Sequence, residues 1–158
     1  MLRRYTSVTL LFTVLFFTLQ SHSKVTLYQE ECGSCHMAYQ PRLMATSSWE
    51  KLMSAKELSD HFGEDIMFED QLILDGVNAY LVNNSFRYPA NFPGKISTSI
   101  RITDMPSLAR HHRRIQKKYI TQKAVGSISN CAACHTEAEK GNYDERKIII
   151  PGYGKYND

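Results

Sequence analysis

A five-residue pattern of cysteine and histidine occurs twice in this sequence. Residues 32–36 read CGSCH and residues 131–135 read CAACH, and together they contain all four cysteines of the 158-residue sequence. Cys-x-x-Cys-His is typical of c-type haem attachment, in which two thiols bind the porphyrin edge and the adjoining histidine ligates the iron. Residues three apart on a helical turn lie about 5–6 Å from each other, so both sulfurs can reach one edge. The sequence therefore predicts two covalently bound haem c groups. Cys32 and Cys35 would attach the first and His36 would ligate its iron, and Cys131, Cys134 and His135 would do the same for the second.

Other uses of paired cysteines explain this pattern less well. Two disulfides would not explain why a histidine follows each pair of cysteines. A zinc site of four cysteines usually has its pairs close together, whereas residues 36–130 separate these two. A thioredoxin-like redox dithiol needs one such pair on a β-α-β unit, and neither copy follows a strand-like alternation. Haem attachment is the interpretation that accounts for the four cysteines and the two histidines that follow them.

The N-terminus indicates export. Arg3 and Arg4 precede the apolar run VTLLFTVLFFTL, and small residues follow at 21–23, as in a secretory signal peptide cleaved after Ser23. The run is shorter than the roughly 20 residues of a membrane-spanning helix, so we expect no stable membrane insertion after cleavage. Residues 24–158 carry 17 basic and 16 acidic residues, and nothing in them suggests nucleic-acid binding. We therefore expect a periplasmic protein.

The rest of the chain predicts a mainly α protein. Its fold class would be two small cytochrome c-like helical lobes, each wrapped around one covalently bound haem. A connector rich in Pro, Gly, Asn and Ser at residues 84–106 separates helical patterns, which places the lobes at residues 24–88 and 89–158. The helices that the patterns predict span residues 28–39, 47–63, 68–83, 107–119 and 131–140, and residues 148–150 form a short strand or an extended segment.

The second axial ligand of each iron comes from the remaining histidines or methionines. His61 ends a predicted helix beside Phe62 and Gly63, where its ring can project into a pocket. Only one of the neighbours His111 and His112 can face a given iron, because adjacent helical side chains point about 100° apart. A methionine is the rival ligand, since Met105-Pro106 is similar to the loop methionine of many monohaem cytochromes c. The residues alone do not choose among His111, His112 and Met105.

Several stretches resemble the bacterial dihaem cytochrome c family. They are residues 32–41 (CGSCHMAYQP), Ser48-Trp49, Leu52-Met53, residues 61–64 (HFGE), Tyr80-Leu81, residues 101–103 (RIT) and the second Cys-x-x-Cys-His. The resemblance implies a periplasmic carrier with two bis-histidine haems. It favours His61 as the distal ligand of the first haem and His112 as that of the second. Met105 and His111 depart from the family pattern. The resemblance also implies a small oxygen-binding cytochrome c and a membrane cytochrome b as partners.

These features predict an electron-transfer protein rather than an enzyme. Two imidazoles on each iron leave no coordination position open for a substrate. The alternatives are a haem enzyme, such as a peroxidase or small-molecule reductase with one open haem, and a haem-based sensor or docking module. The basic segment from Arg110 to Lys118 suggests the sensor or docking module. The simpler interpretation of this segment is a solvated helix face that also pairs with haem propionates.

Overall fold

The computed structural model describes residues 25, 27–63, 70–94 and 96–156. This part of the chain is mainly helical, which confirms the predicted fold class. The predicted signal peptide at residues 1–23 lies outside the described residues. Among the helices of the described ranges, none is both long and apolar enough to cross a membrane.

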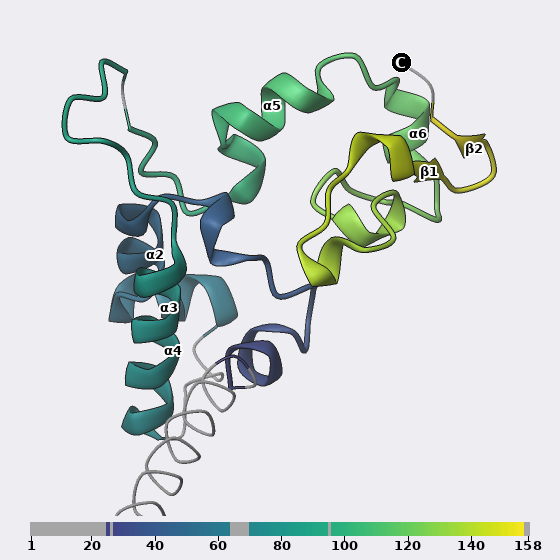
Figure 1. The fold of residues 1–158 in the computed structure, drawn as a ribbon. Coiled ribbons are helices and arrows are strands. Elements are labelled where there is room, and N and C mark those ends of the chain that lie inside the picture. The colour runs from purple at the N-terminus through teal and green to yellow at the C-terminus, as the bar shows by residue number, and fades with distance from the viewer. Residues whose placement is uncertain (1–24, 26, 64–69, 95, 157–158) are drawn as a thin grey trace, which may run out of the picture.

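Short helices and turns follow one another along the chain (Figure 1). Residues 27–32 are helical and lead into the first Cys-x-x-Cys-His turn. The elements that follow are η1 (Pro41–Leu43), α2 (Thr46–Leu52), α3 (Ala55–Phe62), α4 (Gln71–Asn84), η2 (Ile102–Asp104), α5 (Pro106–His112), α6 (Lys117–Thr121), η3 (Cys131–Ala133), η4 (Ala138–Lys140), η5 (Glu145–Lys147), β1 (Ile149–Ile150) and β2 (Gly154–Lys155). The two strands pair antiparallel, with Ile149 opposite Lys155 and Ile150 opposite Gly154.

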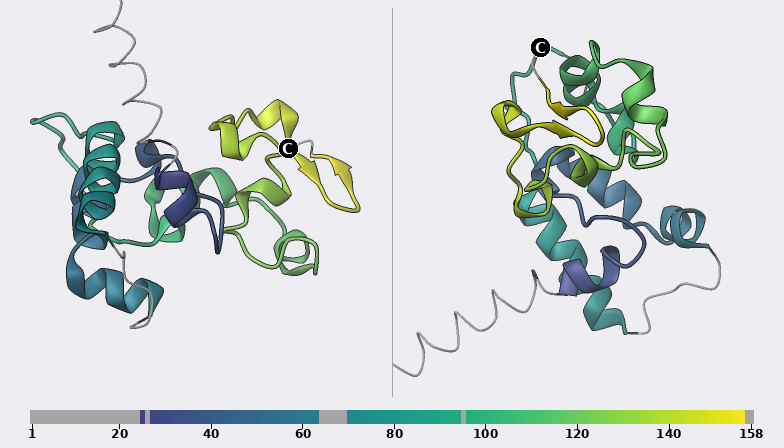
Figure 2. Two further views of the ribbon diagram at one scale, coloured as in Figure 1. Left: turned by 90° about the horizontal axis from the view of Figure 1, so that it is seen from below. Right: turned by 90° about the vertical axis from the view of Figure 1, so that its right-hand side faces the viewer.

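The larger hydrophobic cluster joins α2 and α4 to the N-terminal helix. Helices α2 and α4 lie side by side in both Figure 1 and Figure 2. Trp49 is buried at the centre, and its Nε1–H donates a hydrogen bond of 2.7 Å to the Pro41 carbonyl oxygen, so the indole is satisfied where it is buried. The buried members of this cluster are Tyr28, Met44, Trp49, Leu52, Val77, Leu81, Ile102 and Met105.

A smaller cluster lies around the second Cys-x-x-Cys-His turn. Val125, Cys134 and Ile150 are its buried members, and β1 thereby covers the cysteine that follows η3. Ile102 and Met105 follow the predicted boundary at residues 88/89 but pack in the first cluster. The boundary between the two lobes stays a prediction.

Several predicted helices are shorter than the sequence pattern indicates. The chain leaves the helical conformation after Cys32, and the predicted 47–63 helix divides at Ser54 into α2 and α3. Gln116 has an extended backbone, with ψ of 136°, and divides the 107–119 prediction into α5 and α6. The predicted 131–140 helix is wrong, since η3 and η4 are separate 3-10 turns. Gly141 ends the second turn in the left-handed conformation, as its position predicted.

Candidate functional site

The structure brings the predicted histidines together in two pairs. The ring centroids of His36 and His61 are 6.1 Å apart with planes at 87°, and those of His112 and His135 are 6.1 Å apart with planes at 69°. Two imidazoles bound to one metal ion through nitrogens at about 2 Å each have centroids about 6 Å apart. Each pair therefore has the separation that a single iron between two rings requires.

The first pair combines a turn and a helix end. Gly33 closes the N-terminal helix by donating its backbone N–H to the Gln29 carbonyl oxygen at 3.0 Å, and the chain then turns so that Cys35 and His36 are exposed. The Nδ1 atom of His36 lies 2.9 Å from the Met37 carbonyl oxygen. A carbonyl can only accept a hydrogen bond, so Nδ1 carries the proton and Nε2 keeps the lone pair that can bind a metal.

His61 reaches this site from the end of α3, beside Phe62. Desolvation, followed by the nearby His36 and Arg101, lowers the pKa of His61 below its ordinary value. The neutral imidazole is thus favoured, and it is the form that ligates metals. The ring of Tyr39 stacks on His36 with centroids 5.2 Å apart, which restricts the orientation of the His36 ring.

The second pair also joins the histidine of an attachment turn, His135, to a histidine at the end of a helix, His112. The backbone N–H of His135 donates to the Cys131 carbonyl oxygen at 2.8 Å, so a tight turn links the two. His112 is the last residue of α5, and its Nδ1 lies 2.9 Å from the Leu108 carbonyl oxygen, which again leaves Nε2 free to ligate. Desolvation and then His112 lower the pKa of His135, although Glu145 opposes them.

The second pair opens into a cavity of about 670 Å³. This volume is in the range of small-molecule and cofactor pockets, about 300–1,000 Å³. Its lining includes both histidines of the pair together with Cys131 and Cys134, so the attachment residues and the two rings face one space. Arg114, Arg146 and Lys155 also line the cavity, and they are cations that carboxylates of a bound group could meet. The residues present at this site fit a haem.

All four cysteines are free thiols. Burial is the main reason that the pKa of Cys32 is raised to about 12, and burial also raises the pKa of Cys131 and Cys134. Zinc and nucleophilic roles need thiolates, so these environments do not favour either. In the described ranges, no group of three or more His, Cys, Asp or Glu residues could hold a metal ion. The geometry agrees with a metal that takes two protein ligands and its other ligands from a macrocycle.

Both rival ligands, His111 and Met105, also line the cavity of the second pair, but other contacts hold them. The ring of His111 is exposed, with Nδ1 3.2 Å from the Glu145 carboxylate. Met105 is buried in the first hydrophobic cluster. Of the three residues that the sequence left open, His112 is the one that faces His135.

Contacts between the two halves of the chain were not predicted from the sequence. The Gln40 side chain donates to the Ala138 and Glu139 carbonyl oxygens at 2.8 and 3.1 Å, and its Oε1 accepts from the Tyr143 hydroxyl. Tyr143 in turn contacts the His135 ring, with centroids 5.6 Å apart. Gln40 and Tyr143 are 103 residues apart, so only the inclusion of Gln40 in the family-like stretch at 32–41 could have drawn attention to it.

The fold and the paired sites define a class, that of small helical proteins with two haem sites. Residues 28–143 match the family Dihaem cytochrome c. This chain belongs to the dihaem cytochrome c family, whose members hold two haem groups.

Solved structures give the same assignment. The diheme cytochrome type c of Shewanella baltica OS155 is 32% identical, with a TM-score of 0.68 over 85% of this chain and 98% of that one. The diheme cytochrome c of Rhodobacter sphaeroides is 34% identical, with a TM-score of 0.62 over 75% and 95%. A second structure, described as DHC purified from Rhodobacter sphaeroides, is 39% identical, with a TM-score of 0.58 over 75% and 96%. A search of curated proteins gave no match.

Proposed function

We propose that this protein is a periplasmic electron carrier with two covalently attached, bis-histidine haems. Cys32 and Cys35 would attach the first haem between His36 and His61. Cys131 and Cys134 would attach the second between His135 and His112. The observation that carries the proposal is the equal 6.1 Å separation of the two histidine pairs, each beside a pair of free cysteines.

The residues around each pair suit electron transfer more than substrate chemistry. The Nδ1 hydrogen bonds of His36 and His112 leave Nε2 available on one histidine of each pair. The other histidine of each pair, His61 or His135, would supply the second protein ligand of that iron. A bound haem supplies a metal that takes up and releases one electron. The protein's part is to hold the axial ligands in place and to exclude competing ligands.

The family resemblance supports the proposed partners, and the N-terminal segment supports the proposed compartment. A carrier exported by the signal peptide at residues 1–23 would accept electrons from a membrane cytochrome b or a soluble donor. It would pass them to a small cytochrome partner, such as an oxygen-binding cytochrome c. We do not expect it to act as an enzyme, because neither iron would have a free coordination position.

The experiment uses the protein expressed in the periplasm with the haem-attachment machinery. We expect the intact mass to include two haem groups, the pyridine haemochrome to report thioether-bound haem, and carbon monoxide to leave the reduced spectrum unchanged. A mass without two haems would refute covalent attachment. Carbon monoxide binding with turnover of peroxide or nitrite would replace the carrier with a haem enzyme.

A further inference from the structure

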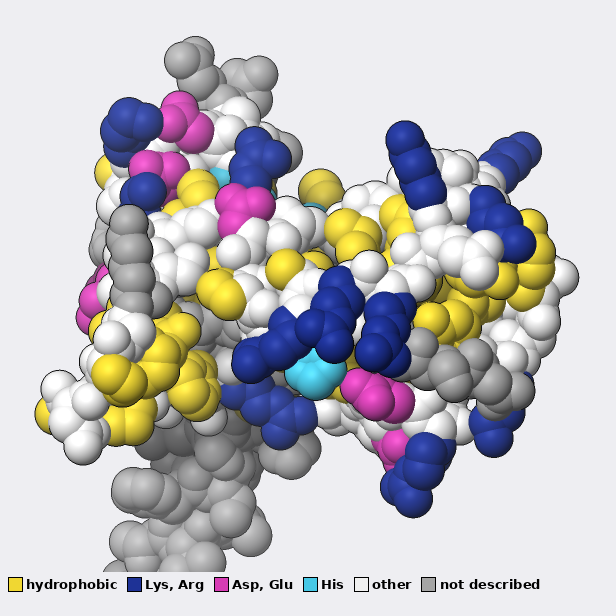
Figure 3. Space-filling view, turned by 90° about the horizontal axis from the view of Figure 1, so that it is seen from above, with side chains coloured by type: hydrophobic (Ala, Val, Ile, Leu, Met, Phe, Trp, Pro, Cys, Tyr) yellow, Lys and Arg dark blue, Asp and Glu magenta, His cyan; other side chains and the backbone are white. Residues whose placement is uncertain are grey.

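Positive charge is concentrated in the part of the chain that carries the second histidine pair. Residues 105–136 contain six Lys or Arg residues and no Asp or Glu. Five of these, Arg110, Arg113, Arg114, Lys117 and Lys118, lie on or between α5 and α6 and are exposed, and we call them the basic surface. Figure 3 looks onto the side of the molecule that carries α5 and α6 and shows Lys and Arg side chains gathered there.

The charge of the whole chain is divided unequally. Residues 24–104 carry 7 basic and 11 acidic residues, a net charge of −4, whereas residues 105–158 carry 10 and 5, a net charge of +5. The sum over residues 24–158 is only +1, so the near-neutral total conceals a strong separation of charge. A molecule of this kind orients a charged partner as it approaches.

Most of the basic surface is available to a partner. Among the described residues, Arg110, Arg113 and Lys117 have no ion-pair partner. Lys118 lies over the rings of Tyr119 and Tyr153 at 5.0 and 5.5 Å from their centroids. Of the five residues only Arg114 lines the cavity of the second site, so the other four are not placed to neutralise a group bound inside it.

The basic surface adjoins the second histidine pair. His112 ends α5, and Arg110 and Arg113 lie two residues before it and one after it. Tyr153, on the hairpin of β1 and β2, is 55% exposed and its ring lies next to Lys118. Ile149 on the same hairpin is 48% exposed, so the hairpin adds exposed apolar area. Protein interfaces commonly combine apolar or aromatic contacts with a charged rim, and this part of the molecule offers both.

We propose that the basic surface docks a soluble redox protein that presents acidic residues around its own redox centre. The inference rests on the proposed function and specifies the partner and the site of exchange, namely the second histidine pair. The acidic first half of the chain would repel the same partner and so favour one orientation. Charge complementarity of this kind acts mainly on the rate of association.

The test measures reduction of the holoprotein by reduced plant-type ferredoxin, used as a small acidic one-electron donor. The variant R110Q/R113Q/K117Q/K118Q removes four charges from the basic surface. The matched control K51Q/K56Q/R87Q/K140Q removes four exposed charges elsewhere. At an ionic strength of about 10 mM we expect the second-order rate constant to fall about tenfold or more in the first variant and less than about threefold in the control. The two variants should converge at about 0.5 M salt.

Haem content and the absorption spectrum verify that both variants are intact. If one fails to fold, the wild-type protein still decides the matter, since its rate with ferredoxin must fall steeply as salt rises. Equal losses in the two variants, or a wild-type rate that salt leaves unchanged, would overturn the proposal. So would salt-sensitive binding to vesicles of phosphatidylglycerol and phosphatidylcholine that the first variant loses while its ferredoxin rate stays unchanged.

Calorimetric titration of the two oxidised proteins separates docking from electron transfer. Binding that the basic-surface variant loses supports docking even if no electron is exchanged. An absence of binding by a protein that carries both haems would refute docking and leave the carrier function standing.

Discussion

Gly33 occupies a position that no other residue fits. A Cβ atom there would lie 2.2 Å from the Gln29 carbonyl oxygen, the same atom that accepts the Gly33 N–H hydrogen bond. Backbone cannot yield to such a clash as a flexible side chain can. The second attachment turn has Ala132 at the matching position, within the 3-10 turn η3.

Gly33→Ala should therefore disturb the first site selectively. We expect it to lower the free energy of unfolding by about 1–3 kcal/mol, as overpacking does, and to reduce occupancy of the first haem. The matched control Ala132→Gly should cost less than about 1 kcal/mol and keep both haems. Thermal unfolding and the haem count per chain give the answer. A Gly33→Ala protein with wild-type stability and two haems would show that this turn has room for a Cβ atom.

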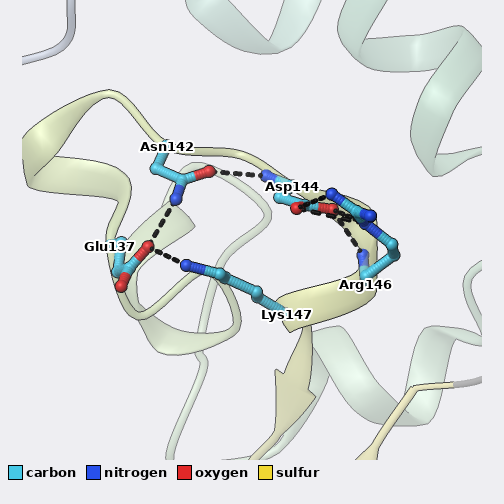
Figure 4. Close-up of polar contacts among 5 residues, drawn as sticks. All are labelled: Glu137, Asn142, Asp144, Arg146 and Lys147. Atoms are coloured by element: carbon cyan, nitrogen blue, oxygen red, sulfur yellow. Dashed lines mark hydrogen bonds and ion pairs between the residues drawn. The ribbon is translucent and has the colours of Figure 1, made fainter.

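Asp144 holds the loop that follows the second attachment turn. Its carboxylate accepts hydrogen bonds from the backbone N–H and the guanidinium of Arg146, and Glu137 accepts from Asn142 and Lys147 nearby (Figure 4). The side-chain bonds to Arg146 are the main reason that the pKa of Asp144 falls from 3.8 to about 2.

This shift predicts a pH dependence for Asp144→Asn. In the unfolded chain the carboxyl binds its proton as the pH falls through 3.8, whereas in the folded protein it stays ionised until about pH 2. Its stabilising contribution is therefore complete above the unfolded pKa and is lost as the pH falls through the folded one. The melting temperature of the variant should lie below that of the wild type at neutral pH, and the gap should close towards about pH 2. A constant gap across this range would contradict the assignment.

The chemistry of the cysteines and histidines could be predicted from spacing, because the Cys-x-x-Cys-His pattern is local. The choice of His112 over His111 needed the family resemblance, since both follow one another on a helix. In the structure only His112 faces His135, while His111 lies against Glu145. Gln40 could not be predicted, because its hydrogen-bond partners lie about a hundred residues along the chain.

Residues 39–42, just after the first attachment turn, connect the first half of the chain to the second. Besides the Gln40 bonds, the Tyr39 hydroxyl donates to the Ser129 carbonyl oxygen at 2.7 Å, and Arg42 donates to the Gly141 carbonyl oxygen. Gly141 has a φ of 73°, and a Cβ there would approach the Gln40 side chain to 3.2 Å. The glycine thus allows both the turn and the close approach.

Gln40→Ala should loosen this connection. It removes the acceptor of the Tyr143 hydroxyl and the donor of two carbonyls, so we expect a loss of about 1–3 kcal/mol in the free energy of unfolding. The matched control is Gln71→Ala, since among the described residues the exposed Gln71 amide bonds only Asp75, within its own helix. It should cost about 0.5 kcal/mol or less. Denaturant titration measures both. Equal effects would mean that the Gln40 contacts add nothing to stability.

Helix boundaries were the least predictable elements. Apolar spacing predicted a helix at residues 68–83, and the structure has α4 at Gln71–Asn84, with the Asp70 side chain capping its first turn. Residues 68 and 69 lie outside the described residues. The prediction failed at residues 131–140, where the turn between Cys131 and His135 and the bonds from Gln40 override a modest helix propensity. Tertiary contacts of this kind leave no local signal in the sequence.

Over the whole molecule, the two histidine pairs lie in regions of opposite net charge. Reduction adds an electron, so positive surroundings stabilise the reduced form and raise the reduction potential. We therefore expect the second haem to have the higher potential of the two. In a redox titration at low ionic strength, the basic-surface variant should lower the higher potential more than the lower one. A larger change in the lower potential would mean that the second haem has the lower reduction potential, contrary to this prediction.

Each iron should lie between the two members of one histidine pair. Electron paramagnetic resonance of the ferric protein tests this ligation in the wild type, in His61→Ala and His112→Ala, and in the control His111→Ala. We predict two low-spin irons in the wild type and in His111→Ala, and one high-spin iron in each of the other two variants. A high-spin iron in the wild type, or its appearance in His111→Ala but not in His112→Ala, would contradict ligation by these two histidine pairs.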